Sequence, residues 1–399
     1  MSSKHPSSVA PLIQRLTLTL AVALVLSGLL VVLAFRPEAS AQITPNDPRF
    51  PEQWAPRKIR APDAWDITRG NASIKVAEVG TGIATKNPVT GVAIADLQNQ
   101  VAPGYNAITP GGSTEDDYAT WGLGTSVAGI MGARTNNSLD MAGTSWNITM
   151  LPVKVCNSTG GCLPADIAEG INWATNNGAQ IINVTPELAP TASTPELDAA
   201  VANAVSKGVL VVAAAGLSDR VGRPGLLPGV IAVGATDSND LVASFSGGGP
   251  QLDIVAPGVS VLTLVKPGCC MSVTGSELAA AHVSSALALL LAAGVPASQA
   301  PNYLFQGAKD LGPAGWDSDY GWGRLDACGA LTAAGIACPL VAAPTATPTR
   351  TPTPVPPTAT PTRTPTAVPP TATPTRTPTP VPPTATPTRT PTPRHRRSW

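Results

Sequence analysis

Histidine is scarce in this chain of 399 residues, which contains three. His5 and His395 lie near the two ends, so His282 is the one imidazole in the central part. A hydroxyl or thiol nucleophile needs a base within hydrogen-bonding reach, and imidazole is the commonest such base. Any histidine-dependent hydrolysis by the central part therefore depends on the position of His282 alone.

Excess positive charge is also missing. The whole chain has 25 basic and 25 acidic residues, but residues 42–340 hold 15 of the basic and 24 of the acidic ones, a net charge of −9. Nucleic-acid-binding domains carry clustered Lys and Arg, so no nucleic acid partner is expected. These 299 residues are predicted to form one globular domain, since a chain of that length buries roughly 75% of its surface on folding.

Residues 1–41 are typical of a secretory signal peptide. Two basic residues precede an apolar run over residues 16–35, and the small residues of segment 39–41 form a cleavage site. The run has 20 residues and is also long enough to span about 30 Å of hydrocarbon, so a retained signal anchor is the alternative. Both alternatives predict an exported protein, secreted or held at the cell surface.

Residues 341–399 lack both acidic residues and an apolar face. From Thr345 the chain repeats every 13 residues with the unit TATPTRTPT followed by PVPP or AVPP, and 18 of the 43 prolines lie here. Proline removes the N–H that helices and sheets need, so the repeats predict an extended, polyproline-II-like stalk. The stalk is a flexible spacer whose threonines are candidates for O-linked sugars, or it contacts the cell envelope, directly or through the basic tail RHRRSW.

Six cysteines fit an exported protein, because disulfides persist outside the cytosol. None of their spacings is the two-residue spacing typical of a zinc site. Six cysteines allow 15 connectivities, so the connectivity stays open. The pairs that are close in sequence are 156 with 162, 328 with 338, and the adjacent 269 with 270.

Short β-branched runs alternate with helical patterns in the central domain. This alternation predicts a parallel sheet covered by helices on both faces, with ligands beyond the C-terminal strand ends. The predicted strands cover residues 73–80, 150–155, 180–185, 209–216 and 230–236, and the predicted helices cover residues 124–133, 164–178 and 195–208.

Several ordered segments resemble the subtilisin-like serine proteases, especially their thermitase-like branch. They are NDPRFPEQWAPRKIRAPDAWDITRG, IKVAEVGTG, WGLGTSVAGIMGARTNNSLDMAGTSWNITMLPVKV, VLVVAAAG, IAVGATDSNDLVASFSGGGPQLDIVAPG, TGSELAAAHV and AKDLGPAGWDSDYGWGRLDACGAL. The resemblance implies the three-layer subtilisin-like fold and serine endopeptidase activity. It also implies that His282 is a structural histidine on the helix after the nucleophile.

The catalytic positions of that family are replaced in this chain. Gly80 stands where the family has its Asp, Leu123 where it has its His, and Glu277 where it has its Ser. Leu217 stands where the family has its oxyanion-hole Asn, and the usual Ser-Leu-Gly of the substrate strand reads Thr-Pro-Glu over residues 185–187. In subtilisin, loss of the triad lowers kcat by about 2 × 10⁶-fold, so the resemblance and its departures together predict an inactive homologue.

A rebuilt active site is the competing hypothesis. Glu277 is one of two carboxylates that acid–base chemistry would need, with Glu78, Asp116 or Asp117 as the second. Glu78 is expected to face a neighbouring loop, and the two aspartates to be solvated. Ser276 is one residue from the nucleophile position, which turns a helical side chain by about 100°. Glu277 itself is expected to remain ionised, because a helix N-terminus favours a carboxylate.

Calcium is the one metal that the resemblance implies. The family's calcium loop resembles TNNSLDMAG, whose ligands would be the Asn137 side chain and the main-chain carbonyls of three neighbours. A further carboxylate is expected directly after Asn87-Pro88, where Val89 stands instead. Calcium takes six to eight oxygen ligands, so both occupancy and absence of the ion stay open. The candidate ligands are Asp47, Thr135, Asn137, Leu139 and Met141.

The sequence therefore predicts an exported, inactive subtilase homologue on a Thr/Pro stalk. Its role would be to bind a peptide or protein in the former substrate cleft, or to act as a surface scaffold. A serine endopeptidase with residual or altered activity is the alternative.

Overall fold

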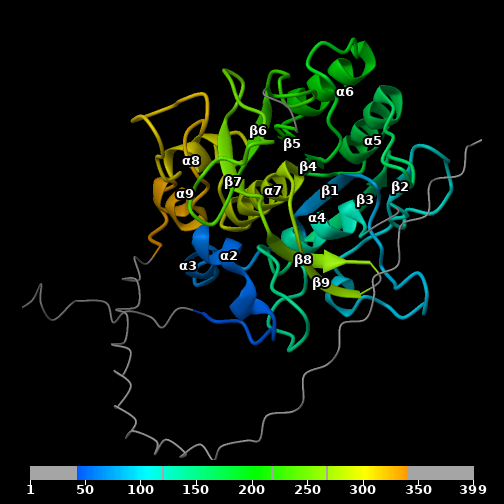
Figure 1. Cartoon of the computed structure of the whole chain (residues 1–399), viewed down its shortest axis with the longest axis horizontal. Helices are drawn as coiled ribbons and strands as arrows, with labels where there is room; N and C mark the ends of the chain where they lie inside the picture. Colours follow the sequence, from blue (N-terminus) through cyan, green and yellow to red (C-terminus); the bar gives the residue numbers. More distant parts are fainter. Residues whose placement is uncertain (1–42, 119–120, 217–219, 267, 339–399) are drawn as a thin grey trace, which may run out of the picture. The chain divides into compact units, whose positions relative to one another are not determined.

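The computed structural model describes residues 43–118, 121–216, 220–266 and 268–338, so the predicted signal segment and stalk lie outside the described residues. Its centre is a sheet of seven parallel strands in the order β2-β3-β1-β4-β5-β6-β7 (Figure 1). The strands are β1 (Lys75–Gly80), β2 (Tyr105–Asn106), β3 (Thr149–Lys154), β4 (Ile181–Val184), β5 (Leu210–Ala214), β6 (Val230–Thr236) and β7 (Ile254–Pro257).

Helices cover both faces of the sheet, as predicted. Along β1, Val76 belongs to the core under one set of helices, and its neighbour Ala77 belongs to the core under the other, because successive strand residues point to opposite faces. The first core lies under α4 (Leu123–Gly132) and α7 (Ser276–Ala292), and the second under α5 (Pro164–Asn176) and α6 (Pro195–Ser206). The α/β subtilisin-like fold is confirmed.

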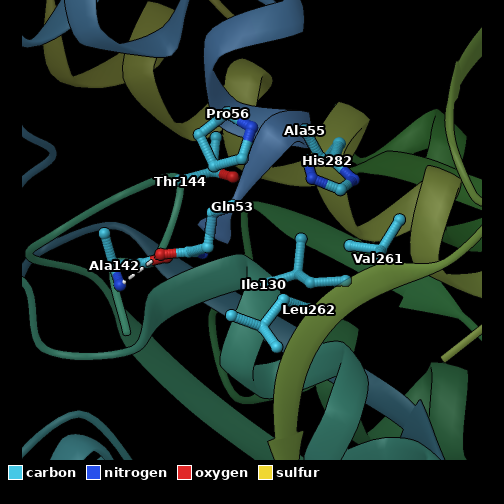
Figure 2. A pocket seen from close by; sticks show the side chains of 9 residues that line it. All are labelled: Gln53, Ala55, Pro56, Ile130, Ala142, Thr144, Val261, Leu262 and His282. Carbon is cyan, nitrogen blue, oxygen red and sulfur yellow. Dashed lines mark hydrogen bonds between the residues drawn. The ribbon is translucent and has the colours of Figure 1, made fainter. Parts of the chain in front are cut away.

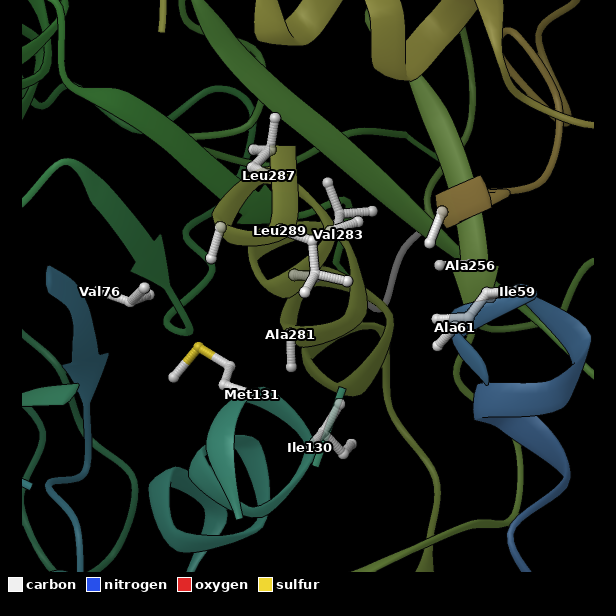
Figure 3. Packing of buried hydrophobic residues seen from close by; sticks show 14 of the residues in the cluster. Ile59, Ala61, Val76, Ile130, Met131, Ala256, Ala281, Val283, Leu287 and Leu289 are labelled. Atoms are coloured by element: carbon white, nitrogen blue, oxygen red, sulfur yellow. The ribbon is translucent and has the colours of Figure 1, made fainter. Parts of the chain in front are cut away.

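Helix α7 is the central helix of the molecule. Apolar residues lie on all its sides, which is typical of a helix enclosed by protein. Figure 3 shows Ala281 and Leu289 of α7 on the side of Met131 and Ile130 of α4. The N-terminus of α7 lies beyond the C-terminal ends of the central strands, where parallel sheets place their ligands.

The remaining elements are short and depend on tertiary contacts. A two-stranded antiparallel hairpin, β8 (Val261–Val265) with β9 (Gly268–Val273), lies beside α4. The short helices are η1 (Phe50–Glu52), α2 (Trp54–Lys58), α3 (Ala61–Trp65), η2 (Ala95–Leu97), α8 (Ala300–Gln306) and α9 (Ala327–Ala333).

The three close cysteine pairs are the three disulfides of the chain, Cys156–Cys162, Cys269–Cys270 and Cys328–Cys338.

Helix α3, near the start of the described chain, is joined to α9, the last described helix. The guanidinium of Arg60, just before α3, contacts Asp63 at 2.8 Å and Asp326 at 3.3 Å. The backbone N–H of Ala327, the first residue of α9, donates to the carbonyl of Ile59 at 2.8 Å. The N-terminal arm is therefore completed by residues from the other end of the domain.

Among the described residues, no helix combines the length and the apolar character that crossing a bilayer requires.

Candidate functional site

Three of the predicted catalytic positions lie at the C-terminal edge of the sheet. Gly80 ends β1, Leu123 begins α4, and Glu277 lies in the first turn of α7. The N–H of Gly124 donates to the hydroxyl of Thr81 at 2.9 Å, so the end of β1 meets the start of α4. The fourth position, Leu217, lies outside the described residues.

The carboxyl group of Glu78 fills the space beside Gly80. A Cβ on Gly80 would overlap Glu78 Oε1, and a Cβ on Gly124 would lie 2.8 Å from Glu78 Oε2. Thr185, in the loop after β4, donates its hydroxyl to Glu78 Oε1 at 2.9 Å. Glu78 therefore faces a neighbouring loop, as expected, but its side chain is fully buried.

Burial governs the protonation of Glu78. It raises the pKa of this carboxyl to about 8, and the hydrogen bond from Thr185 and the charge of Lys154 offset only part of that increase. The negative charge of Asp116 raises the pKa further. At neutral pH the position next to Gly80 therefore holds a largely protonated acid.

The helix N-terminus does not govern the pKa of Glu277. Burial raises its pKa, its own backbone N–H lowers it by less, and the negative charge of Glu187 raises it again. The loss of hydration outweighs the helix terminus, and a second carboxylate lies close by, so the ionisation of Glu277 at neutral pH stays a prediction. The residue as a whole is half-buried.

Glu187 occupies the space between two backbone segments. A Cβ on Gly216 would overlap the Glu187 carboxyl group, and one on Gly222 would lie 2.5 Å from Glu187 Cγ. The next residue, Leu188, exchanges two backbone hydrogen bonds of 2.8 Å with Arg223. Because Gly216 and Gly222 have no side chains, they leave room for the side chain of Glu187.

Ser276 is not a displaced nucleophile. It is fully buried, and its hydroxyl donates to the carbonyl of Gly216 at 3.3 Å. It is accordingly a structural group at the start of α7.

The two aspartates expected to be solvated differ from each other. Asp116 is buried, and its Oδ2 accepts from the N–H and the hydroxyl of Thr125 at 2.9 and 2.8 Å. The expectation was wrong for Asp116 because it satisfies donors in the first turn of α4, a role that favours a carboxylate. Asp117 is 56% exposed and pairs with Lys154 Nζ at 2.5 Å.

His282 is a buried structural histidine, as the resemblance implied. Its Nδ1 donates to the carbonyl of Leu278 at 2.8 Å, and burial lowers its pKa to about 4. Figure 2 shows the ring with Gln53 and Thr144 around a gap too small for a water molecule. His282 lies five residues after Glu277, which places it roughly 140° around the helix, so it cannot serve as a base at that position.

The candidate calcium loop is organised by two buried aspartates. Asp47 Oδ2 accepts from the N–H of Asn136 at 2.7 Å. Asp96 accepts from the side chain of Asn137 at 2.8 Å and from the N–H of Met141 at 3.0 Å. Both carboxylates thus contact the loop that contains the predicted carbonyl ligands.

Asp96 supplies the carboxylate that was expected directly after Asn87-Pro88 and not found there. The N–H of Ile94 donates to the carbonyl of Thr85 at 2.9 Å, so residues 86–93 leave the chain and return to the same place. This excursion moves the carboxylate along the sequence without moving it away from the loop. Asp96 was missed because the carboxylate was expected directly after Asn87-Pro88 in the sequence. The sequence feature that could have revealed it is the Ala95-Asp96-Leu97 turn.

The donor set fits a hard cation. Calcium takes carboxylate, amide and carbonyl oxygens, and Asp47, Asp96, the Asn137 side chain and the loop carbonyls supply them. Burial raises the pKa of Asp96 to about 6, and the charges of Asp140 and Asp47 add to that increase. No group of three or more His, Cys, Asp or Glu suited to a metal occurs in the described part of the chain, so carbonyl oxygens from Thr135, Leu139 and Met141 would have to complete the shell.

The fold and the order of these segments define an α/β protein of the subtilisin architecture, and comparison with known families agrees. Residues 71–323 match the Subtilase family of peptidase S8. The chain belongs to the subtilase family.

Individual relatives align over most of the described domain. The chain is 33% identical over 299 residues to a thermophilic serine proteinase of Bacillus sp. (strain AK1), covering 73% of this chain and 70% of the relative. It is 36% identical over 258 residues to thermitase of Thermoactinomyces vulgaris, covering 64% and 88%. It is 36% identical over 263 residues to subtilisin DY of Bacillus licheniformis, covering 64% and 89%.

Proposed function

We propose that this subtilase homologue is exported, has lost proteolytic activity and acts as a scaffold or binding module at the cell surface. The observation that carries the proposal is the position of Glu78. Its carboxyl group fills the space that an Asp side chain at Gly80 would need, so the first catalytic position is both substituted and filled.

The other two triad positions support the same proposal. Leu123 cannot accept a proton, and Glu277 has a raised pKa and no neighbouring imidazole, since His282 lies on another side of α7. A serine-type acyl transfer needs a nucleophile, a base and oxyanion donors in one geometry. The described residues supply none of the family's three triad side chains.

The state of the cleft favours a scaffold over a peptide-binding groove at this site. The Glu187 side chain packs on Gly216 and Gly222 and fills the space that a side chain at either position would need. A peptide or protein partner in the former cleft would have to displace it. Contact with the cell envelope would then come from the predicted stalk or its basic tail, which lie outside the described residues.

Residual or altered serine endopeptidase activity is the second candidate function. It is supported by the family and by the names of the relatives, which are proteinases. The two candidates differ in one measurable property, a reactive serine.

The test uses the full-length chain treated with a fluorophosphonate probe, alongside casein hydrolysis. We expect no labelling and no cleavage above a heat-denatured sample, with subtilisin DY as the positive control. A Ser276→Ala variant is the matched control for the chain. Labelling or casein cleavage that disappears in this variant would overturn the proposal and establish the endopeptidase alternative.

A further inference from the structure

A hollow of about 450 Å³ lies on α8, apart from the former catalytic centre. Its lining residues, which we call the aromatic shelf, are Asn302, Phe305, Gln306 and Trp322. Asn302 and Gln306 are four residues apart on α8, with Phe305 between them at a spacing of three, so all three lie on one side of the helix. Trp322 comes from the loop that precedes α9 (Figure 1).

The loop presents two tryptophans to solvent. Trp322 is 46% exposed and Trp316 is 40% exposed. Asp317 and Gly321 exchange two backbone hydrogen bonds of 3.0 and 2.9 Å, which close the loop between the two indoles. Large aromatic side chains stabilise a fold by burial, and these two leave nearly half of that potential burial unused.

Hydrogen bonds anchor the loop at both tryptophans despite their exposure. The backbone N–H of Trp322 donates to the carbonyl of Asp253 at 2.8 Å. The indole Nε1 of Trp316 donates to the carbonyl of Leu252, the preceding residue, at 2.9 Å. An exposed aromatic face on an anchored loop beside a hollow is typical of a recognition surface.

We propose that the aromatic shelf binds a neutral saccharide. The apolar C–H face of a pyranose ring packs on an aromatic ring, and the edge of the same ring presents hydroxyl groups. Asn302 and Gln306 each offer one amide acceptor and two donors, spaced one helical turn apart, where they meet hydroxyls on the sugar edge. The volume lies within the range of small-molecule sites, roughly 300–1,000 Å³.

The chemistry of the lining decides between ligand classes. All four lining side chains are uncharged, which disfavours phosphates, uronic acids and cationic ligands that need a partner of opposite charge. The two carboxamides would be poorly satisfied against a purely apolar partner, since buried polar groups need hydrogen bonds. A neutral, hydroxyl-rich ligand with one apolar face satisfies both kinds of side chain. This site is independent of the proposed function, because it shares no residue with the former catalytic centre.

The test is titration of the full-length chain with cellohexaose, maltohexaose and the N-acetylglucosamine hexamer, followed by calorimetry and tryptophan fluorescence. We expect at least one of the three to bind with a change in tryptophan emission. Trp322→Ala should weaken that binding at least tenfold. The double variant Asn302→Ala, Gln306→Ala should weaken it similarly and keeps the test valid if Trp322→Ala does not fold.

Trp173→Ala is the matched control, because Trp173 is a partly exposed tryptophan on α5, which Figure 1 shows far from α8. It should leave saccharide binding within twofold of the parent. Binding of none of the three saccharides would overturn the proposal, as would binding that is equal in the shelf variants. Exclusive binding of hexagalacturonate, or of a Thr/Pro repeat peptide, would also overturn it, the latter in favour of a proline-rich partner.

Discussion

The carboxyl group of Glu78 occupies the volume that a side chain on Gly80 would need. The two residues are two positions apart on β1, so their side chains point to the same face of the sheet. A glycine at 80 and a glutamate at 78 are therefore a compensating pair. On the proposed assignment of position 80 to the family's Asp, changing Gly80 alone should not restore that side chain, because Glu78 fills its place.

Gly80→Asp should destabilise the protein by about 2–3 kcal/mol, because it overpacks the space beside Glu78. Adding Glu78→Ala should recover most of that loss, and a double-mutant cycle in denaturant melts measures the coupling. Gly268→Asp is the matched control, because a Cβ at Gly268 meets open space. Equal and small effects at both glycines would contradict the proposed compensation.

Restoring the family's catalytic set needs five changes. Gly80→Asp, Leu123→His, Leu217→Asn and Glu277→Ser alone should give no casein hydrolysis, since Glu78 still fills the Asp site. With Glu78→Ala added, weak hydrolysis should appear if Glu187 leaves room for substrate. Activity in the four-change protein would show that Glu78 can move aside.

The free energy of unfolding should fall as pH rises from 6.5 to 8. Glu78 has a folded pKa of about 8 against an ordinary value of 4.5, so in this window the folded state holds a proton that the unfolded state has released. Its contribution is present in full below pH 4.5 and is lost as pH rises through 8, with a slope of at most about 1.4 kcal/mol per pH unit.

Glu78 dominates the upper half of this window. Asp96 and Asp253, with pKa values of about 6, add a small decline near pH 6.5. His282 has its pKa lowered from 6.5 to about 4 and adds an opposite slope near pH 6.5, because the unfolded chain is protonated there and the fold is not. Glu78→Gln should remove most of the decline between pH 7.2 and 8, and Glu196→Gln, at an exposed position, should leave it. Urea melts at pH 6.5, 7.2 and 8 measure the difference. A slope unchanged in Glu78→Gln would place the pKa of Glu78 below this range.

Glu277→Gln should stabilise the protein slightly, by up to about 1 kcal/mol at pH 8. The change removes a half-buried carboxylate whose pKa is raised by burial and by Glu187. A raised pKa means that ionisation lowers stability, so the gain should grow from pH 5 to pH 8. Thermal melts at the two pH values measure it, and a loss of stability at pH 8 would mean that the charged form makes an essential contact.

Calcium should raise the melting temperature relative to EDTA, because it binds only the folded loop. A concentration of 100 times the Kd would add about 2.7 kcal/mol. Asp96→Asn should abolish the calcium-dependent shift, and the exposed Asp319→Asn should leave it. A shift that persists in Asp96→Asn would place the ion elsewhere, and no shift in the parent would mean that the loop has lost calcium.

The sheet and its covering helices could be predicted because their signals are local. The run at residues 209–216 is apolar and β-branched, and the pattern at residues 164–178 is amphipathic with Pro164 at its start. Strand β2 has two residues, and α8 and α9 have seven each. Elements this short are stabilised by their neighbours and carry little signal of their own.

Sequence motifs assign positions to the candidate site, which stay predictions, but they do not show what surrounds those positions. Gly80 and Glu277 could be assigned from motifs, but the raised pKa of Glu277 comes from its burial, to which the charge of Glu187, distant in sequence, adds. The location of the Glu78 carboxyl depends on Gly80, Gly124 and Thr185 together. These residues come from separate parts of the sequence and meet only in the folded protein, so the sequence alone could not predict their contacts.

The link between Arg60 and Asp326 also constrains the order of folding. The partners are 266 residues apart, so α3 cannot acquire its final contacts until nearly the whole domain has been synthesised. Contacts of such long sequence separation are slow to form. A chain that emerges N-terminus first therefore keeps an open N-terminal arm until α9 arrives, and any truncation before Ala327 leaves that arm without its closing partner.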